Sequence, residues 1–257
     1  MNFRLRVILK CIGLSAALGA AAICRLGAQG GPPMITDDPG TPGDKKWEIN
    51  LGWSTQRTAG STVYGLPLLD ANYGIGERIE LTYESPWAVL DSDHGSRSGP
   101  GDSLLGVKWR FYDAGEKGWQ ASVYPQVTFL DPGSHSDRRG LADSATTLLM
   151  PFEVEMDLGP VSMNFDFGHV FSSESGGDSW MGGVIFGREI VKGWELDAET
   201  HLNASNNLGR HEWILNFGSR IDLSEHITLM IALGRDLSTT LGPRSTLLSY
   251  LGFQFRL

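Results

Sequence analysis

The chain is poor in cysteine, in long apolar runs and in positive charge. Its two cysteines, Cys11 and Cys24, both lie near the N-terminus, so the rest of the chain has no disulfide framework, thiolate metal site or cysteine nucleophile. No apolar run reaches the roughly eighteen residues that a membrane-spanning helix needs. The formal net charge of -9 excludes binding of nucleic acid through a basic patch. The sequence also contains no phosphate-binding loop, paired CxxC or HExxH motif.

Residues 1–28 have the features of a secretory signal peptide. Three basic residues, Arg4, Arg6 and Lys10, precede an apolar stretch that is too short to cross a bilayer as a helix. Lipidation of Cys24 is an alternative, but the Ala-Ala-Ile before it matches a lipidation signal poorly. We therefore expect an exported protein that is cleaved near residue 28.

Residues 29–45 form a Pro/Gly-rich N-terminal segment, in which prolines and glycines exclude regular structure. Such a segment is a linker, a cap or a small plug. Asp37 and Asp38, together with Thr36, could ligate calcium. Aspartate just before Pro39 is more typical of an Asx turn, so we favour the turn and predict no metal site.

Residues 46–257 repeat a pattern in which every second residue is apolar. This period of two indicates β-strands with one apolar and one polar face. At the C-terminus, for example, Leu251, Phe253 and Phe255 alternate with Gly252 and Gln254. The pattern predicts about twelve strands of about 11–13 residues, which is long enough to cross a bilayer in a tilted barrel. The expected ranges are 46–56, 63–74, 77–89, 102–112, 118–130, 146–157, 160–172, 179–190, 193–204, 210–221, 225–236 and 246–257.

The chain ends inside a strand, and that strand needs a partner for its free edge. A closed barrel provides one, because its last strand pairs with its first. The connections alternate between short turns, such as 158–160, and longer polar loops, such as 91–101 and 131–140. Outer-membrane barrels combine short periplasmic turns with longer extracellular loops. The sequence therefore predicts an all-β fold, a transmembrane antiparallel up-and-down β-barrel with both termini in the periplasm.

The polar faces of these strands carry many charged residues. A lone charge in a dry interior costs several kcal/mol, so these groups need a wet lumen or mutual pairing. A β-sandwich would place them in solvent and is the alternative fold, but aromatic residues near strand ends favour a membrane barrel. The facing of strand 179–190 stays open, because Arg188 shares a face with Trp180 and Phe186. The lumen-facing candidates are Glu80, Glu84, Lys108, Arg110, Glu153, Glu195, Asp197, Glu199, Glu212 and Arg220, and the aromatic-girdle candidates are Trp47, Trp87, Trp119, Trp194, Trp213 and Phe255.

Four stretches carry a resemblance to a known family: Thr36 to Gly43, Trp47 to Asn50, Leu66 to Gly76, and Gly101-Asp102 followed by Gly106 to Arg110. Through them most of the chain after residue 28 resembles a bacterial outer-membrane barrel family labelled "MetA-pathway of phenol degradation", or simply "transporter". The resemblance implies transport of aromatic or hydrophobic compounds. It brings no catalytic residues with it.

Some outer-membrane barrels are phospholipases that use a Ser–His–Asn arrangement, so we looked for one. His201, Asn203 and Ser205 share one strand face. Neighbours on such a face are roughly 6.5–7 Å apart along the strand, which is too far for histidine to activate serine directly. We predict no catalytic residues and no cofactor.

The acidic inner face predicts a passive channel. Glu195, Asp197 and Glu199 form a column of like charge that either pairs with basic residues across the lumen and plugs the barrel, or biases a pore toward cations. We expect a channel for small molecules in the cell outer membrane of a Gram-negative bacterium. The alternatives are a lipid-acting barrel enzyme and a closed structural or adhesive barrel without conductance. Expected partners are outer-membrane lipid and lipopolysaccharide, the barrel-assembly machinery through strand 247–257, and an unidentified small-molecule solute, but no nucleic acid.

Overall fold

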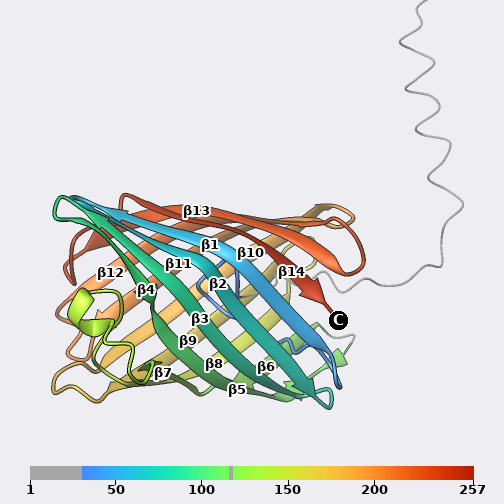
Figure 1. The fold of residues 1–257 in the computed structure, drawn as a ribbon. Helices are drawn as coiled ribbons and strands as arrows, with labels where there is room; N and C mark the ends of the chain where they lie inside the picture. The colour runs from blue at the N-terminus through green and yellow to red at the C-terminus, as the bar shows by residue number, and fades with distance from the viewer. Residues whose placement is uncertain (1–30, 116–117) are drawn as a thin grey trace, which may run out of the picture.

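The computed structural model describes residues 31–115 and 118–257, so the predicted signal peptide lies outside the described residues. The described chain forms an all-β barrel with antiparallel strands (Figure 1), which confirms the predicted fold class. Within these two ranges, no helix is long and apolar enough to span a membrane.

The sheet contains fourteen β-segments. Two of these segments do not count as separate strands of the wall. β6 and β7 are halves of one interrupted strand, and β4 is the short return arm of a hairpin with β3. Twelve strands therefore cross the wall, as predicted. The segments are β1 (Trp47–Thr58), β2 (Ser61–Ile75), β3 (Ile79–Ser92), β4 (Gly95–Pro100), β5 (Asp102–Asp113), β6 (Trp119–Val123), β7 (Gln126–Leu130), β8 (Thr147–Asp157), β9 (Ser162–Ser172), β10 (Ser179–Val191), β11 (Trp194–Ser205), β12 (His211–Asp222), β13 (Ile227–Thr239) and β14 (Leu247–Arg256), with a short 3-10 helix η2 (Asp137–Arg139) between β7 and β8.

The first and last strands close the barrel. β1 and β14 pair antiparallel, with Glu48 opposite Arg256. Beyond that ladder, Trp47 and Leu257 exchange two backbone hydrogen bonds of 2.9 Å. On its other edge β14 pairs with β13. The terminal strand therefore has no free edge, which is what its position at the end of the chain predicted.

The two ends of the barrel differ. Short connections such as 76–78 and 192–193 lie at one end, which we call the turn end. Longer connections such as 131–146 and 173–178 lie at the other, which we call the loop end. The segment 91–101, expected as a loop, is mostly strand: β3 continues to Ser92 and folds back as β4 through Gly95, whose φ is 101°. Hydrogen bonds from Arg97 to the Arg139 carbonyl, and from Arg139 to the Ser98 carbonyl, tie this hairpin to the loop that contains η2.

The strand predicted over 118–130 is not continuous. It breaks between β6 and β7 at Tyr124 and Pro125, because proline has no N–H to donate to the ladder. The ladder is bridged instead by bonds from Tyr124 N to the Pro151 carbonyl and from Val107 N to the Pro125 carbonyl, of 3.3 and 3.0 Å. The Tyr124 side chain points into the barrel, on the same face as Ser122 and Gln126, and is 4% exposed.

The outer wall is apolar and exposed, which is the pattern of the outer faces of membrane barrels. Phe217 and Leu233, near the middle of their strands, are 59% and 58% exposed. The predicted girdle residues also point outward at both ends of the wall. Trp47, Trp119 and Trp194 begin their strands at the turn end, Trp87 and Trp213 lie toward the loop end, and all five are exposed, whereas Phe255 at the turn end is half-buried.

Most of the side chains buried in the barrel interior are polar, whereas the buried side chains of a soluble protein are mostly apolar. The facing of β10, which the sequence left open, is settled here. Ile185 points inward and is fully buried, while Phe186 points outward and is exposed. Ile185, Met34 and Ala232 form a small apolar cluster inside the barrel, against which Tyr250 packs.

Candidate functional site

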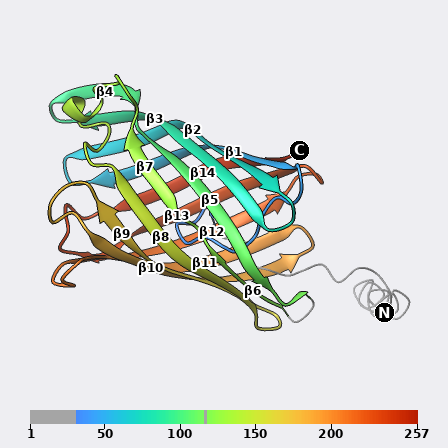
Figure 2. The same ribbon diagram turned by 90° about the horizontal axis from the view of Figure 1, so that it is seen from below.

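The N-terminal segment lies inside the lumen, where Figure 2 shows it between the walls of the barrel. We call residues 31–42 the plug segment. It enters through a tight turn, in which Met34 N donates to the Gly31 carbonyl at 2.8 Å and Gly31 N donates to the Thr36 carbonyl at 2.9 Å. This is the plug arrangement among the three that the sequence left open. The sequence could not choose because the segment has no periodicity to say what it contacts.

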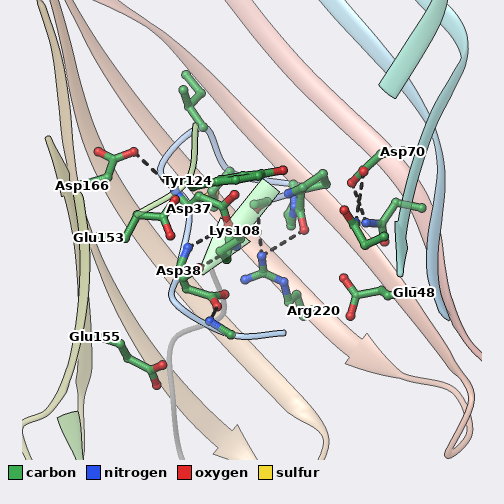
Figure 3. A pocket seen from close by; sticks show the side chains of 18 of the residues that line it. Asp37, Asp38, Glu48, Asp70, Lys108, Tyr124, Glu153, Glu155, Asp166 and Arg220 are labelled. Atoms are coloured by element: carbon green, nitrogen blue, oxygen red, sulfur yellow. Dashed lines mark hydrogen bonds and ion pairs between the residues drawn. The ribbon is translucent and has the colours of Figure 1, made fainter. Parts of the chain in front are cut away.

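Lys108 on β5 is the first of three groups that hold the plug segment. Its ammonium is 3.1 Å from Asp37 Oδ1, donates to the Asp38 carbonyl at 2.7 Å, and lies 3.7 Å from Glu80 Oε1. It also lies 4.7 Å from the centre of the Tyr124 ring, within the range of a cation–π contact. Figure 3 shows Asp37 and Asp38 beside this lysine. The lysine is buried, and these contacts give it the partners that a buried charge requires.

Arg220 on β12 is the second. Its guanidinium donates to the Gly31 and Pro32 carbonyls at 3.0 and 2.9 Å, and to Asp197 Oδ2 at 3.2 Å. The Gly31 carbonyl also accepts a hydrogen bond from Met34 N, but a carbonyl oxygen has two lone pairs, so it can accept from the guanidinium as well. Asp197, on the neighbouring strand β11, keeps that charge compensated.

Glu199 on β11 is the third. Its Oε1 accepts hydrogen bonds from Ile35 N at 3.0 Å and Thr36 N at 2.6 Å, while Oε2 accepts one from Asn216 at 2.5 Å. Asp166 on β9 accepts a longer one, of 3.4 Å, from Asp37 N. The column of acids predicted on β11 is thus divided. Asp197 pairs with an arginine, and Glu199 binds the backbone of the plug segment.

Two glycines let the plug segment approach the wall. A Cβ on Gly183 would overlap Thr36 Oγ1, and one on Gly218 would lie 2.9 Å from Met34 Sδ. Gly183 faces inward between Asp166 and His201, and the His201 ring itself lies 3.5 Å from Thr36 Oγ1. Any larger side chain at these positions would displace the plug segment. The sequence could not predict this close contact, because an inward-facing glycine is equally compatible with an open lumen and with a lumen that holds a plug.

The predicted lumen-facing residues occupy different surroundings. Arg110 pairs with its own wall, through Gln120 at 2.7 Å, Asp113 and the Glu77 carbonyl. Glu153 accepts a 2.5 Å hydrogen bond from Ser122. Glu212 lies at the loop end and accepts a 2.9 Å bond from Asn203. Glu80, Glu84, Lys108, Arg110, Glu153, Glu195 and Arg220 line the main cavity described below. Sequence reasoning missed Asp70, Tyr124 and the plug carbonyls as parts of this site.

A cavity of about 880 Å³ runs along the lumen beside the plug segment. Its lining reaches from Gly193, in a turn at the turn end, to Asn203, near the loop end of β11. Toward the turn end the lining is mostly charged. Toward the loop end it becomes largely apolar, through Leu68, Leu104, Leu149, Val170 and Met181. The plug segment therefore narrows the lumen at the junction between a charged and an apolar half.

Little in the described structure suggests a metal or a catalytic site. No group of three or more His, Cys, Asp or Glu side chains in residues 31–115 and 118–257 is arranged to hold a metal ion. His201, considered beside Ser205 in the sequence, meets Thr36 of the plug segment instead. A different pair does form across neighbouring strands: His211 Nε2 lies 3.2 Å from Ser238 Oγ. Among the described residues its second ring nitrogen has no hydrogen-bond partner to orient it, which an activated serine requires.

Known structures share this fold. An outer-membrane channel from Pseudomonas putida F1 superposes with a TM-score of 0.72 at 13% identity, over 86% of this chain and 98% of that one. The NanC porin gives 0.61 at 11% identity over 81% and 100%, and the KdgM porin 0.57 at 8% over 80% and 98%. No family model and no curated protein matches the sequence. At these identities the likeness concerns the fold, and the phenol-degradation family remains a hypothesis.

Proposed function

We propose that this protein is a passive channel of the bacterial outer membrane that admits small molecules. In the membrane, the turn end would face the periplasm and the loop end would face the outside of the cell, as in outer-membrane barrels generally. The observation that carries the proposal is the cavity that continues past the plug segment, from the turn end to the apolar half of the lumen. A closed structural barrel has no need of such a passage.

The lining of the cavity supports a preference among solutes. Leu68, Leu104 and Leu149 offer apolar contacts on the outer side of the plug segment, which suits solutes with an aromatic or hydrophobic part. The resemblance to the phenol-degradation family points the same way. Acidic side chains outnumber basic ones along the lining, so ions that pass should be mostly cations.

Planar-bilayer recording of the refolded full-length protein tests the proposal. We expect a finite, salt-dependent current with a cation bias, measured as a reversal potential in a salt gradient. Changing Glu195 to glutamine should reduce the bias, because this carboxylate lines the cavity. Changing the exposed Glu225, in a turn at the turn end, to glutamine is the matched control. An absence of current in repeated preparations of folded barrel would contradict the channel.

The His211–Ser238 contact favours a second candidate, a barrel enzyme that acts on lipid. The pair lies near the loop end, on strands whose outer faces are apolar. A serine hydrolase needs this contact, but it also needs a group that orients the histidine and donors that stabilise the oxyanion. Hydrolysis of phospholipid that is lost in Ser238→Ala would support the enzyme, and intact phospholipid with a measurable current would support the channel.

A further inference from the structure

One wall of the cavity carries hydrogen-bond acceptors at a single level on four adjacent strands. Gln254, Asn50, Asp70 and Glu84 lie directly opposite one another across β14, β1, β2 and β3. We call these four residues the acceptor row. Neighbouring strands in a sheet are about 4.8 Å apart, so the row spans about 14 Å. Asn50, Asp70 and Glu84 line the cavity, and Asp70 stands apart from the cluster around Lys108 in Figure 3.

The hydrogen bonds of the row leave acceptors unused and fix their direction. Asn50 Nδ2 donates to Asp70 Oδ2 at 2.8 Å, and Asn72 Nδ2 donates to Asp70 Oδ1 at 3.0 Å. A carboxylate only accepts, so the amide of Asn50 cannot be turned the other way without losing its bond. Its Oδ1 therefore stays an acceptor. Asn50 is 2% exposed, and neither this oxygen nor Gln254 Oε1 has a hydrogen-bond partner in the described part of the chain.

Neither carboxylate of the row forms an ion pair with a basic side chain in the described residues. Asp70 and Glu84 are directly opposite each other on β2 and β3, an arrangement in which like charges repel. Glu84 makes no hydrogen bond or ion pair with any residue in 31–115 or 118–257. The nearby basic side chains are engaged elsewhere, since Lys108 holds Asp37 and Glu80 and Arg220 holds Asp197.

An aromatic ring lies one register step from the row. Gly52 and Gly252 pair across β1 and β14, one step toward the loop end from Asn50 and Gln254. A Cβ on either glycine would lie about 2.5–2.6 Å from atoms of the Tyr250 side chain, so the ring rests on the bare backbone of both strands. Tyr250 also lines the cavity. An aromatic face beside paired carboxylates attracts a cation.

From this arrangement we propose that the acceptor row binds the primary ammonium group of a solute inside the lumen. An ammonium brings one positive charge and three N–H donors. It can bridge Asp70 and Glu84 and take the free oxygen of Asn50, while its organic part meets Tyr250 and the neighbouring Leu68 and Leu104. This inference deepens the proposed channel function by naming a solute class, and it rests on that function only for the passage of the solute.

Equilibrium binding tests the site without requiring passage. The full-length protein, refolded in nonionic detergent, is titrated calorimetrically with butylammonium chloride in mildly alkaline buffer, where the amine keeps its proton. Tetramethylammonium, which has the charge but no N–H, and butanol, which has the apolar part but no charge, are the comparison ligands. We expect butylammonium to bind about tenfold or more tightly than either one, because a hydrogen bond to a charged group contributes that much.

Substitutions place the binding in the row. Glu84→Gln should weaken butylammonium binding about tenfold or more, and Asp70→Asn should do the same. Glu225→Gln and Asp93→Asn, both in exposed turns, should leave it unchanged. Glu84 has no partner to lose, so its variant should fold, which heat-modifiable gel migration checks. Equal binding of all three ligands, or binding that survives Glu84→Gln, would overturn the site. Binding without any bilayer current would instead count against the channel and leave the site standing.

Discussion

Lys108 of β5 and Asp37 of the plug segment form an ion pair in the centre of the lumen, with 3.1 Å between Nζ and Oδ1. The same ammonium donates to the Asp38 carbonyl. Lys108 therefore binds both a carboxylate and a backbone carbonyl of the plug segment, which lies outside the sheet. The wall is held by its own hydrogen-bonded ladder. Loss of Lys108 should loosen the plug segment more than the barrel.

The variant Lys108→Met should increase conductance. Removing one partner of a buried ion pair costs about 3–5 kcal/mol. Here that cost destabilises the docking of the plug segment in the lumen. We expect larger or more frequent open events in single-channel records of the variant, compared with the wild type. Lys192→Met, in the exposed turn between β10 and β11, is the control. Identical records for the wild type and both variants would mean that the plug segment does not limit the current.

The variant Gly183→Ala should displace the plug segment by steric overlap. The new Cβ would overlap Thr36 Oγ1, so the bonds from Ile35 N and Thr36 N to Glu199 should lengthen or break. Gly182→Ala is a close control, because its Cβ faces the outer wall and meets no atom nearer than 3.3 Å. Limited proteolysis of the folded barrel should cut the plug segment faster in Gly183→Ala only. Equal cutting rates in the two variants would show that this contact does not anchor it.

The variant Phe217→Arg should destabilise the barrel in a bilayer. Phe217 lies mid-strand on the outer wall and is 59% exposed, so an arginine there would meet lipid hydrocarbon. The expected loss is about 2–4 kcal/mol in the free energy of unfolding, measured by denaturant titration in liposomes. Leu208→Arg, in the β11–β12 connection at the loop end, should change stability by less than about 0.5 kcal/mol. Equal effects at the two positions would argue against a lipid-facing wall.

The variant Ser238→Ala should have the same conductance as the wild type, and neither protein should hydrolyse phospholipid. Ser238 contacts His211 at 3.2 Å, yet no described group orients the histidine. We therefore expect wild-type protein in phospholipid vesicles to release no more fatty acid than the variant does. A release by the wild type that the substitution abolishes would move the assignment to the lipid-acting enzyme.

The alternation of side chains was sufficient to predict the wall. The period of two assigned Phe253 outward and Gln254 inward before any contact was known, because a strand in a barrel has only these two faces. It failed at Pro125, where the missing N–H breaks the ladder. It was ambiguous at β10, where Arg188 shares a face with Trp180 and Phe186.

The lumen could be predicted only as a polar surface. Glu195, Asp197 and Glu199 form one column in sequence, but Asp197 meets an arginine of the next strand and Glu199 meets backbone amides of the plug segment. No residue pattern could distinguish these outcomes, because each depends on what lies across the barrel. Asp38 forms the Asx turn that the sequence predicts, with Gly40 N donating to its Oδ1 at 2.5 Å. The contacts of Asp37 and of the Asp38 carbonyl with Lys108 depend instead on the path of the plug segment.

By itself the sequence determined a barrel, its strands and the faces of most of them, because these follow from a local repeat and from the need to pair every strand edge. The tertiary structure alone decided where the N-terminal segment lies and which charges inside are paired. Those contacts join groups as far apart in the chain as Gly31 and Arg220, 189 residues. Only the closure of the barrel brings them within hydrogen-bond distance, and a local repeat carries no information about that distance.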